Sequence, residues 1–167
     1  MCLIDEVLNL KKGECSVVNM DELFTRHKDD VYRLALSYTR SAQEAEDVCQ
    51  TAFLKLMEQR YVTPGKEKAW LMQTTANECR NLLRSSWWKK TIQLDETIPA
   101  PDGMYDHVYH SVMSLQPKYR VVLYLHYYEQ YSTREIAQLL HISQSAVTTR
   151  LDRARKQLKP LLEEVCL

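Results

Sequence analysis

The sequence is poor in glycine and has no closely paired cysteines. Only 3 of its 167 residues are glycine, which leaves little room for the tight turns that join β-strands, so the composition favours an all-α fold. The cysteines are scattered, and none forms a Cys-x-x-Cys pair, which argues against a zinc knuckle or a disulfide framework and indicates reduced thiols. They are Cys2, Cys15, Cys49, Cys79 and Cys166.

A long apolar run and an excess of charge of either sign are also absent. No stretch could span a bilayer and the first residues carry no basic leader, so we expect a cytoplasmic protein with no membrane insertion of its own. Its 22 basic and 22 acidic residues balance, which argues against coating nucleic acid through charge alone. The charges are unevenly placed, however. Most of the charged residues in 66–90 are basic, whereas residues 91–110 contain acids but no Lys or Arg.

The segment 132–159 has the pattern of a helix-turn-helix, a motif that enters the DNA major groove. Ser132 and Glu135 have the spacing of a capping box for the first helix, and Ser143 can cap the second. The second helix has an apolar stripe at helical spacing and a polar, mainly basic opposite face. A solvated helical hairpin is the alternative. The stripe is Val147, Leu151, Ala154 and Leu158.

The helical pattern continues over most of the chain and is interrupted by a proline-containing connector. Three helices are predicted in the first half, at about residues 21–40, 41–60 and 66–88, and three more segments in the second half, at 105–115, 120–128 and the helix-turn-helix. We therefore predict two small helical domains joined by a linker. The boundaries are an N-terminal extension at 1–18, a first domain at 19–90, a linker at 91–104 and a second domain at 105–164.

The second predicted helix has two apolar surfaces where a surface helix needs one. The side of Ala45, Val48 and Ala52 suits the core. The other side joins acids to large apolar groups and resembles a docking surface for a basic, partly apolar partner helix. The alternative is that residues 1–18 fold back over it. The candidate docking residues are Glu46, Asp47, Gln50, Phe53, Leu54 and Met57.

The third predicted helix carries amides, arginines and an aromatic on the side opposite Leu71, Thr75 and Cys79. Amides bond base edges, arginines hold phosphates and aromatic rings stack on unpaired bases, so this side suits a single strand or a melting duplex. The alternative is that the tryptophans are structural anchors, which we expect for Trp70. The candidate strand-binding residues are Tyr61, Gln73, Asn77, Arg80, Asn81, Arg84 and Trp88.

Taken together, these motifs resemble the sigma-70 family of bacterial RNA polymerase initiation factors, and within it the extracytoplasmic-function (ECF) group. The resemblance covers about residues 20–164. It rests on several segments in the family's order. These are Ala45–Leu56, Ala69–Asn81, Leu115–Pro117, Tyr131–Ala137 and Val147–Leu158.

The resemblance implies a sigma factor that binds core RNA polymerase, recognises promoter DNA and assists strand opening without any cofactor. The surface of the second helix would dock on the clamp helices of the polymerase. Tyr61, Gln73, Asn77 and Asn81 match positions around a base flipped from the downstream promoter element. The family also implies an anti-sigma factor as a partner.

The resemblance further implies that the last helix reads the upstream promoter element as duplex. Thr148 and Asp152 differ from the residue types common in relatives, and His141 replaces the usual turn glycine, which histidine can do because it tolerates a left-handed backbone. The base preference therefore does not follow from the family. The candidate upstream residues are Gln144, Ser145, Thr148, Thr149, Arg150, Asp152, Arg153, Arg155 and Lys156.

Other classes of protein explain less of the pattern. A helix-turn-helix repressor would leave the strand-binding side of the third helix unused, and a helical protein-binding adaptor would leave the basic last helix unused. An enzyme or metal protein would need a site, and we predict neither catalytic residues nor a metal. His107 and His110, with Asp106 nearby, lack a third ligand in the sequence pattern.

Overall fold

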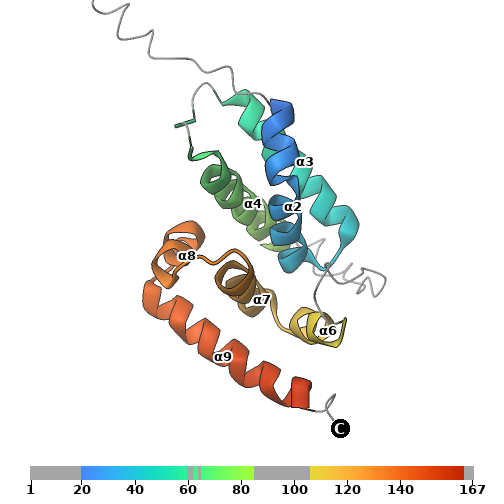
Figure 1. Ribbon diagram of the computed structural model, residues 1–167, viewed down its shortest axis with the longest axis vertical. Coiled ribbons are helices and arrows are strands. Elements are labelled where there is room, and N and C mark those ends of the chain that lie inside the picture. Colours follow the sequence, from blue (N-terminus) through green and yellow to red (C-terminus); the bar gives the residue numbers. More distant parts are fainter. Residues whose placement is uncertain (1–19, 60–61, 64, 85–105, 164–167) are drawn as a thin grey trace, which may run out of the picture.

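The computed structural model describes residues 20–59, 62–63, 65–84 and 106–163, and all the regular elements among them are helical (Figure 1). The first half of the chain, residues 20–84, supplies three helices, and the second half, residues 106–163, supplies the others. The predicted all-α fold with a helical unit in each half is confirmed. The elements are α2 (Met20–Thr39), α3 (Ala42–Glu58), α4 (Glu67–Arg84), α6 (Asp106–Ser114), α7 (Pro117–Leu123), the π-helical segment η1 (Tyr124–Tyr128), α8 (Thr133–Leu140) and α9 (Gln144–Glu163).

Local signals set the helix ends in the first half. Arg40 takes a left-handed backbone with φ 57° and ends α2, and the Ser41 hydroxyl then caps α3 by accepting from the Glu44 backbone N–H at 3.3 Å. Gly65, with φ 79°, supplies the left-handed turn before α4. The three helices pack around an apolar cluster made of Leu23, Val31, Cys49, Ala52, Phe53, Leu56 and Leu71.

In the second half, each helix begins at a break that the sequence predicts. Pro117 lies in the first turn of α7, where its missing N–H costs nothing. The predicted helix to Tyr128 is present, but its last five residues widen into η1, which the sequence pattern did not indicate. In α9 the predicted stripe is buried at Val147, Leu151 and Ala154 and partly buried at Leu158.

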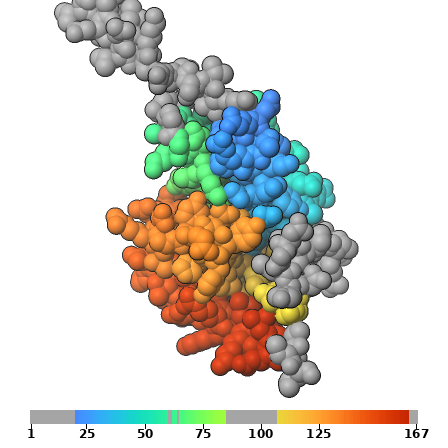
Figure 2. Space-filling model, in the orientation of Figure 1, coloured from blue at the N-terminus to red at the C-terminus, as the bar shows by residue number. Residues whose placement is uncertain are grey.

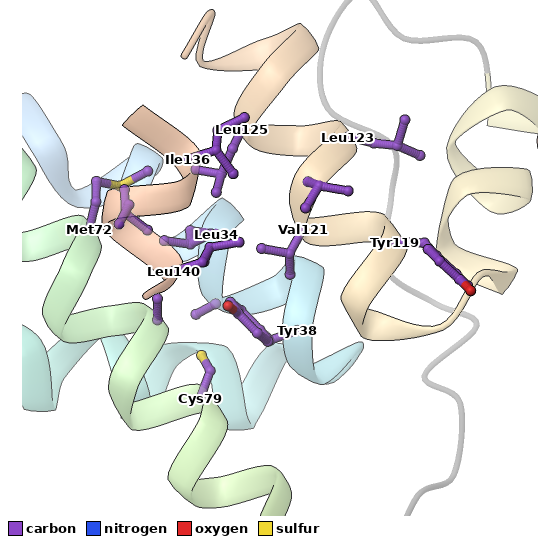
Figure 3. Packing of buried hydrophobic residues seen from close by; sticks show 14 of the residues in the cluster. Leu34, Tyr38, Met72, Cys79, Tyr119, Val121, Leu123, Leu125, Ile136 and Leu140 are labelled. Carbon is purple, nitrogen blue, oxygen red and sulfur yellow. The ribbon is translucent and has the colours of Figure 1, made fainter. Parts of the chain in front are cut away.

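A single apolar cluster joins the two halves. In Figure 3, Met72 of α4 lies near Ile136 and Leu140 of α8, Leu34 of α2 lies next to them, and Cys79 lies further along α4 near Tyr38. Figure 2 shows the orange atoms of the second half directly against the blue and green atoms of the first. The two predicted domains therefore share a core in this structure.

Several predictions concern residues outside the described ranges. These are the N-terminal extension, the linker, Tyr61 and the pair Trp87 and Trp88. Trp70 is described, and it packs at the edge of the first-half cluster, as expected for an anchor.

Candidate nucleic-acid interface

The helix-turn-helix is held in shape by its own side chains and backbone. The Ser132 hydroxyl accepts from the Glu135 backbone N–H at 3.3 Å, and the Glu135 carboxylate accepts from the Ser132 N–H at 2.8 Å, so the predicted capping box is confirmed. The Ser132 hydroxyl also donates to this carboxylate at 2.6 Å, and that bond together with the one from the Ser132 N–H lowers the pKa of Glu135. His141 has the left-handed backbone expected in the turn, φ 51°, and the Ile142 N–H closes the turn on the Ala137 carbonyl at 3.0 Å.

The start of α9 is tied both to its own cap and to α8. The Ser143 hydroxyl accepts from the Ala146 N–H at 3.1 Å, which confirms the predicted cap. The Gln144 amide donates to the Thr133 hydroxyl at 2.9 Å and links the first turns of α9 and α8. The end of α9 that would enter a groove is therefore rigidly placed relative to α8.

The outer face of α9 is exposed along most of its length. Exposed positions in its first three turns are Gln144, Ser145, Thr148, Thr149, Asp152, Arg153, Arg155 and Lys156. Thr148 and Thr149 donate their hydroxyl protons to carbonyls one turn earlier, which leaves their oxygen lone pairs able to accept. This face presents hydrogen-bond acceptors and the exposed cations Arg153 and Lys156.

The two flanking arginines of α9 differ in their surroundings. Arg155 is exposed, bonds Asp152 at 3.0 Å and the Tyr127 hydroxyl at 2.8 Å, and these contacts raise its pKa. Arg150 is half-buried, and its charge acts on buried Tyr38 of the first half. Arg150 is therefore less accessible than the exposed cations of the outer face.

The predicted strand-binding side of α4 is only partly accessible. Asn81 and Arg84 are exposed, whereas Gln73, Asn77 and Arg80 are half-buried, and the second half contacts Gln73 and Arg80. Leu71, Thr75 and Cys79 are buried, so the predicted inward face is confirmed. No local pattern predicts the cover over Gln73 and Arg80, because it comes from residues 68 and 60 positions further along the chain.

The structure corrects one of the positions predicted for the exposed side of α3. Glu46, Asp47 and Gln50 are exposed, and Leu54 and Met57 are 59% and 62% exposed, as predicted. These five residues are named the α3 surface. Phe53 is the exception.

The predicted exposure of Phe53 is wrong, because its side chain is buried with 5% of its area accessible. Its ring packs edge-on against Phe24 of α2 at a centroid distance of 4.9 Å. The exposed aromatic next to it is Phe24, at 45%. The sequence pattern missed Phe24, although it stands one position off the buried stripe that begins at Leu23.

Comparison with known proteins shows the family of the chain. Two family models match in order, sigma-70 region 2 over residues 23–89 and sigma-70 region 4 over residues 107–158. The chain belongs to the sigma-70 family. Within that family it is an RNA polymerase sigma factor of the ECF group, as the predicted resemblance indicates.

The relatives of this sigma factor are similar over nearly its whole length. The ECF RNA polymerase sigma factor SigE of Mycolicibacterium smegmatis is 29% identical over 93% of this chain and 66% of its own. The RNA polymerase sigma factor SigV of Bacillus subtilis is 27% identical over 90% of this chain and 95% of its own.

A solved structure shares the fold of this sigma factor. It is the sigma factor RpoE in complex with the anti-sigma factor NepR from Bartonella quintana, with a TM-score of 0.69 and 18% identity over 87% of this chain and 97% of that one. At 18% identity, this similarity shows only that the two chains share a fold.

The described part of this sigma factor contains no metal-binding cluster and no helical membrane span. No group of three or more metal-ligating side chains gathers among those residues, so neither His107 nor His110 of α6 belongs to one. None of the helices there combines the length and the apolar character that crossing a membrane requires.

Proposed function

We propose that this sigma factor divides promoter recognition between α9 and α4. In this division α9 reads the upstream element as duplex DNA, because its outer face is exposed and its first turn is rigidly anchored. Thr149, Asp152 and Arg153 lie nearest the bases, and the flanking cations hold phosphates. The full upstream set is Gln144, Ser145, Thr148, Thr149, Arg150, Asp152, Arg153, Arg155 and Lys156.

The downstream element is captured by α4 as a separated strand. Amide side chains can bond an extruded base on its Watson–Crick edge, and arginines can hold the adjoining phosphates. Capture of an unpaired base couples binding energy to strand opening, so no covalent step is needed and the protein is not an enzyme. The proposed residues are Gln73, Asn77, Arg80, Asn81 and Arg84, with Tyr61 and Trp88 from outside the described ranges.

The α3 surface is the proposed contact with core polymerase. It combines the carboxylates of Glu46 and Asp47 with the exposed apolar side chains of Leu54 and Met57 on one helix. A basic helix with an apolar stripe is the matching partner. Gln50 lies between the acids and the apolar pair, and Phe53 supports the surface from below.

The proposed setting is the bacterial cytoplasm, where core polymerase and promoter DNA are found. The proposed functional units are residues 19–90 and 105–164, with 91–104 as linker and 1–18 as an extension. An anti-sigma factor is a further proposed partner, since a structural neighbour is a sigma factor in complex with one.

The observation that carries this proposal is that one chain presents three distinct surfaces. In sequence order they are the α3 surface, the strand-binding side of α4 and the outer face of α9. The test is run-off transcription with purified core RNA polymerase on fragmented DNA of the source genome, with and without this protein, followed by mapping of RNA starts. New starts that share two spaced upstream elements support the proposal. Binding to DNA without association with core polymerase and without new starts would contradict it and favour a repressor.

A further inference from the structure

The two halves of the chain meet at the strand-binding side of α4. Gln73 Nε2 lies 2.8 Å from His141 Nε2, in the turn of the helix-turn-helix, and the two nitrogens share a hydrogen bond. The Arg80 guanidinium donates to the Leu140 carbonyl at 3.0 Å, at the end of α8, and also to the Asn77 amide oxygen. Three of the proposed strand-binding side chains are therefore engaged with the turn or with each other.

Beneath these polar contacts lies an apolar seam. Met72, Ala76 and Cys79, one helical turn apart on α4, are fully buried in the same cluster as Ile136 and Leu140 of α8 (Figure 3). Burial of these side chains stabilises the contact in proportion to the apolar area removed from water. The turn is thus packed on α4 and does not merely touch it.

A second contact ties α2 and α4 to the end of η1. The Lys68 ammonium lies 2.8 Å from both the Asp30 and the Glu129 carboxylates, and the Glu129 side chain is only 3% exposed. The Tyr124 hydroxyl donates toward Glu129 at 2.6 Å. Burial lowers the pKa of Lys68, but its bonds to the two carboxylates outweigh this and leave the pKa raised. Lys68 therefore neutralises a nearly buried carboxylate from the other half.

The outer face of α9 is not involved in the contact between the halves. Thr149, Asp152 and Arg153 are exposed, on the side of α9 away from its buried stripe. In this closed arrangement the duplex-reading surface is open and the strand-binding surface is partly covered, at Gln73 and Arg80. The two surfaces are thus unequal in access.

We propose that the turn of the helix-turn-helix is an intramolecular occupant of the strand-binding side of α4, and that a separated DNA strand must displace it. The inference rests on the function proposed above. The closed chain reads the upstream duplex but binds the downstream strand only after the halves separate, so its affinity for the strand falls by the fraction of open molecules.

The contact at Lys68 allows the halves to be separated without changing any proposed DNA-binding residue. Lys68→Met removes the cation and leaves the Glu129 carboxylate nearly buried without its partner, which favours separation and hydration. Glu129→Gln removes the charge from the other side and is a second route if the first variant does not fold. Lys55→Met is the matched control, because Lys55 pairs with Glu78 at 2.7 Å entirely within the first half.

The first measurement is the distance between spin labels at Gln43→Cys of α3 and Gln157→Cys of α9, both exposed positions. Cys2, Cys15 and Cys166 are replaced by serine, and Cys49 and Cys79 are buried. The parent and Lys55→Met should give one narrow distance distribution, and Lys68→Met should add longer distances. A broad distribution in the parent would overturn the closed arrangement.

The second measurement is the affinity of the free protein for two DNA probes from a mapped promoter. One is the upstream element as duplex, and the other adds the downstream element as a single strand. Lys68→Met and Glu129→Gln should bind the second probe about tenfold more tightly than the parent. All the variants should bind the duplex probe equally.

The outcomes separate this inference from the function on which it rests. If the parent supports transcription but an opened variant binds the single-strand probe no more tightly, the turn does not compete with DNA and the inference fails alone. If no variant binds the probe and no starts appear, the proposed function fails, and the label distances still decide whether the halves are closed.

Discussion

Arg120 of α7 donates from Nη2 to the carbonyl of Tyr38 at the end of α2, across 2.9 Å and 82 positions of sequence. Its Nε donates to the Ser37 carbonyl at 2.8 Å, and its Nη1 reaches the carbonyls of Met113 and Leu115. Burial, reinforced by the charge of Arg40, lowers the pKa of Arg120 to about 9. The guanidinium is thus a buried cation held by the carbonyl ends of α2 and α6, at the junction of the two halves.

Replacing Arg120 with methionine should lower the free energy of unfolding by about 3 kcal/mol, because several buried carbonyls lose their donor while the apolar volume is roughly kept. Urea unfolding followed by circular dichroism measures the change. Arg134→Met, at an exposed position of α8, should change stability by less than about 0.5 kcal/mol. Equal stabilities of the two variants would contradict the structural role of Arg120.

Replacing Arg153 with alanine should weaken binding to the upstream duplex by about tenfold, as expected for loss of a base-contacting arginine. Quantitative footprinting of that element is the measurement. Lys159→Ala removes the same charge from a later, exposed turn of α9 and controls for net charge. An unchanged footprint for Arg153→Ala would refute its position near the bases.

Replacing Leu54 and Met57 together with serine should weaken binding to core polymerase by about tenfold or more, because exposed apolar groups at the centre of an interface carry much of its energy. Co-purification and a titration with core enzyme measure this, and the urea midpoint should stay the same. Tyr127→Ser, at a 53% exposed position in the second half, should leave polymerase affinity unchanged. A double variant that binds at full strength would remove α3 as the docking surface.

Phe53→Ala should behave differently from those neighbours. Its ring is buried against Phe24, so truncation leaves a cavity and should lower the free energy of unfolding by about 3 kcal/mol. Any loss of polymerase binding should then follow the loss of folded protein. Unchanged stability would show that the ring is exposed after all.

The two buried thiols should be unreactive in the folded protein. Burial raises the pKa of Cys49 to about 11 and also raises that of Cys79, and the thiolate is the reactive form. With Cys2, Cys15 and Cys166 replaced by serine, a chromogenic disulfide reagent at pH 8 should react only after urea is added. Rapid reaction without urea would contradict burial.

The same burial makes stability depend on pH. Because the folded pKa of Cys49 exceeds the ordinary 9.0, the contribution of the buried thiol to the free energy of unfolding should be lost as the pH rises through about 9 to 11.

Local patterns predicted the parts of the structure that local forces decide. Ser132, Glu135 and Ser143 cap their helices as predicted, because a cap is satisfied by a backbone N–H three residues away. The buried stripe of α9 follows from the 3.6-residue period, and His141 accepts the left-handed turn.

The misassigned and missed positions depend on contacts between distant segments. Phe53 stands on the α3 face predicted to meet solvent, yet Phe24 of α2 covers it. Gln73 and Arg80 stand on the outward side of α4, yet the turn at Leu140 and His141 covers them. No spacing within one helix reports which distant segment will pack on its outer face.

The sequence alone determined that this protein is helical, where its recognition helix begins, and the family to which it belongs, because capping, periodicity and motif order are properties of neighbouring residues. Only the tertiary structure decided that Arg120 is buried and that the helix-turn-helix closes over α4. A charged or amide side chain is ordinarily exposed. Arg120 is buried here because carbonyls from both halves accept its hydrogen bonds, and those partners come together only when the whole chain has folded.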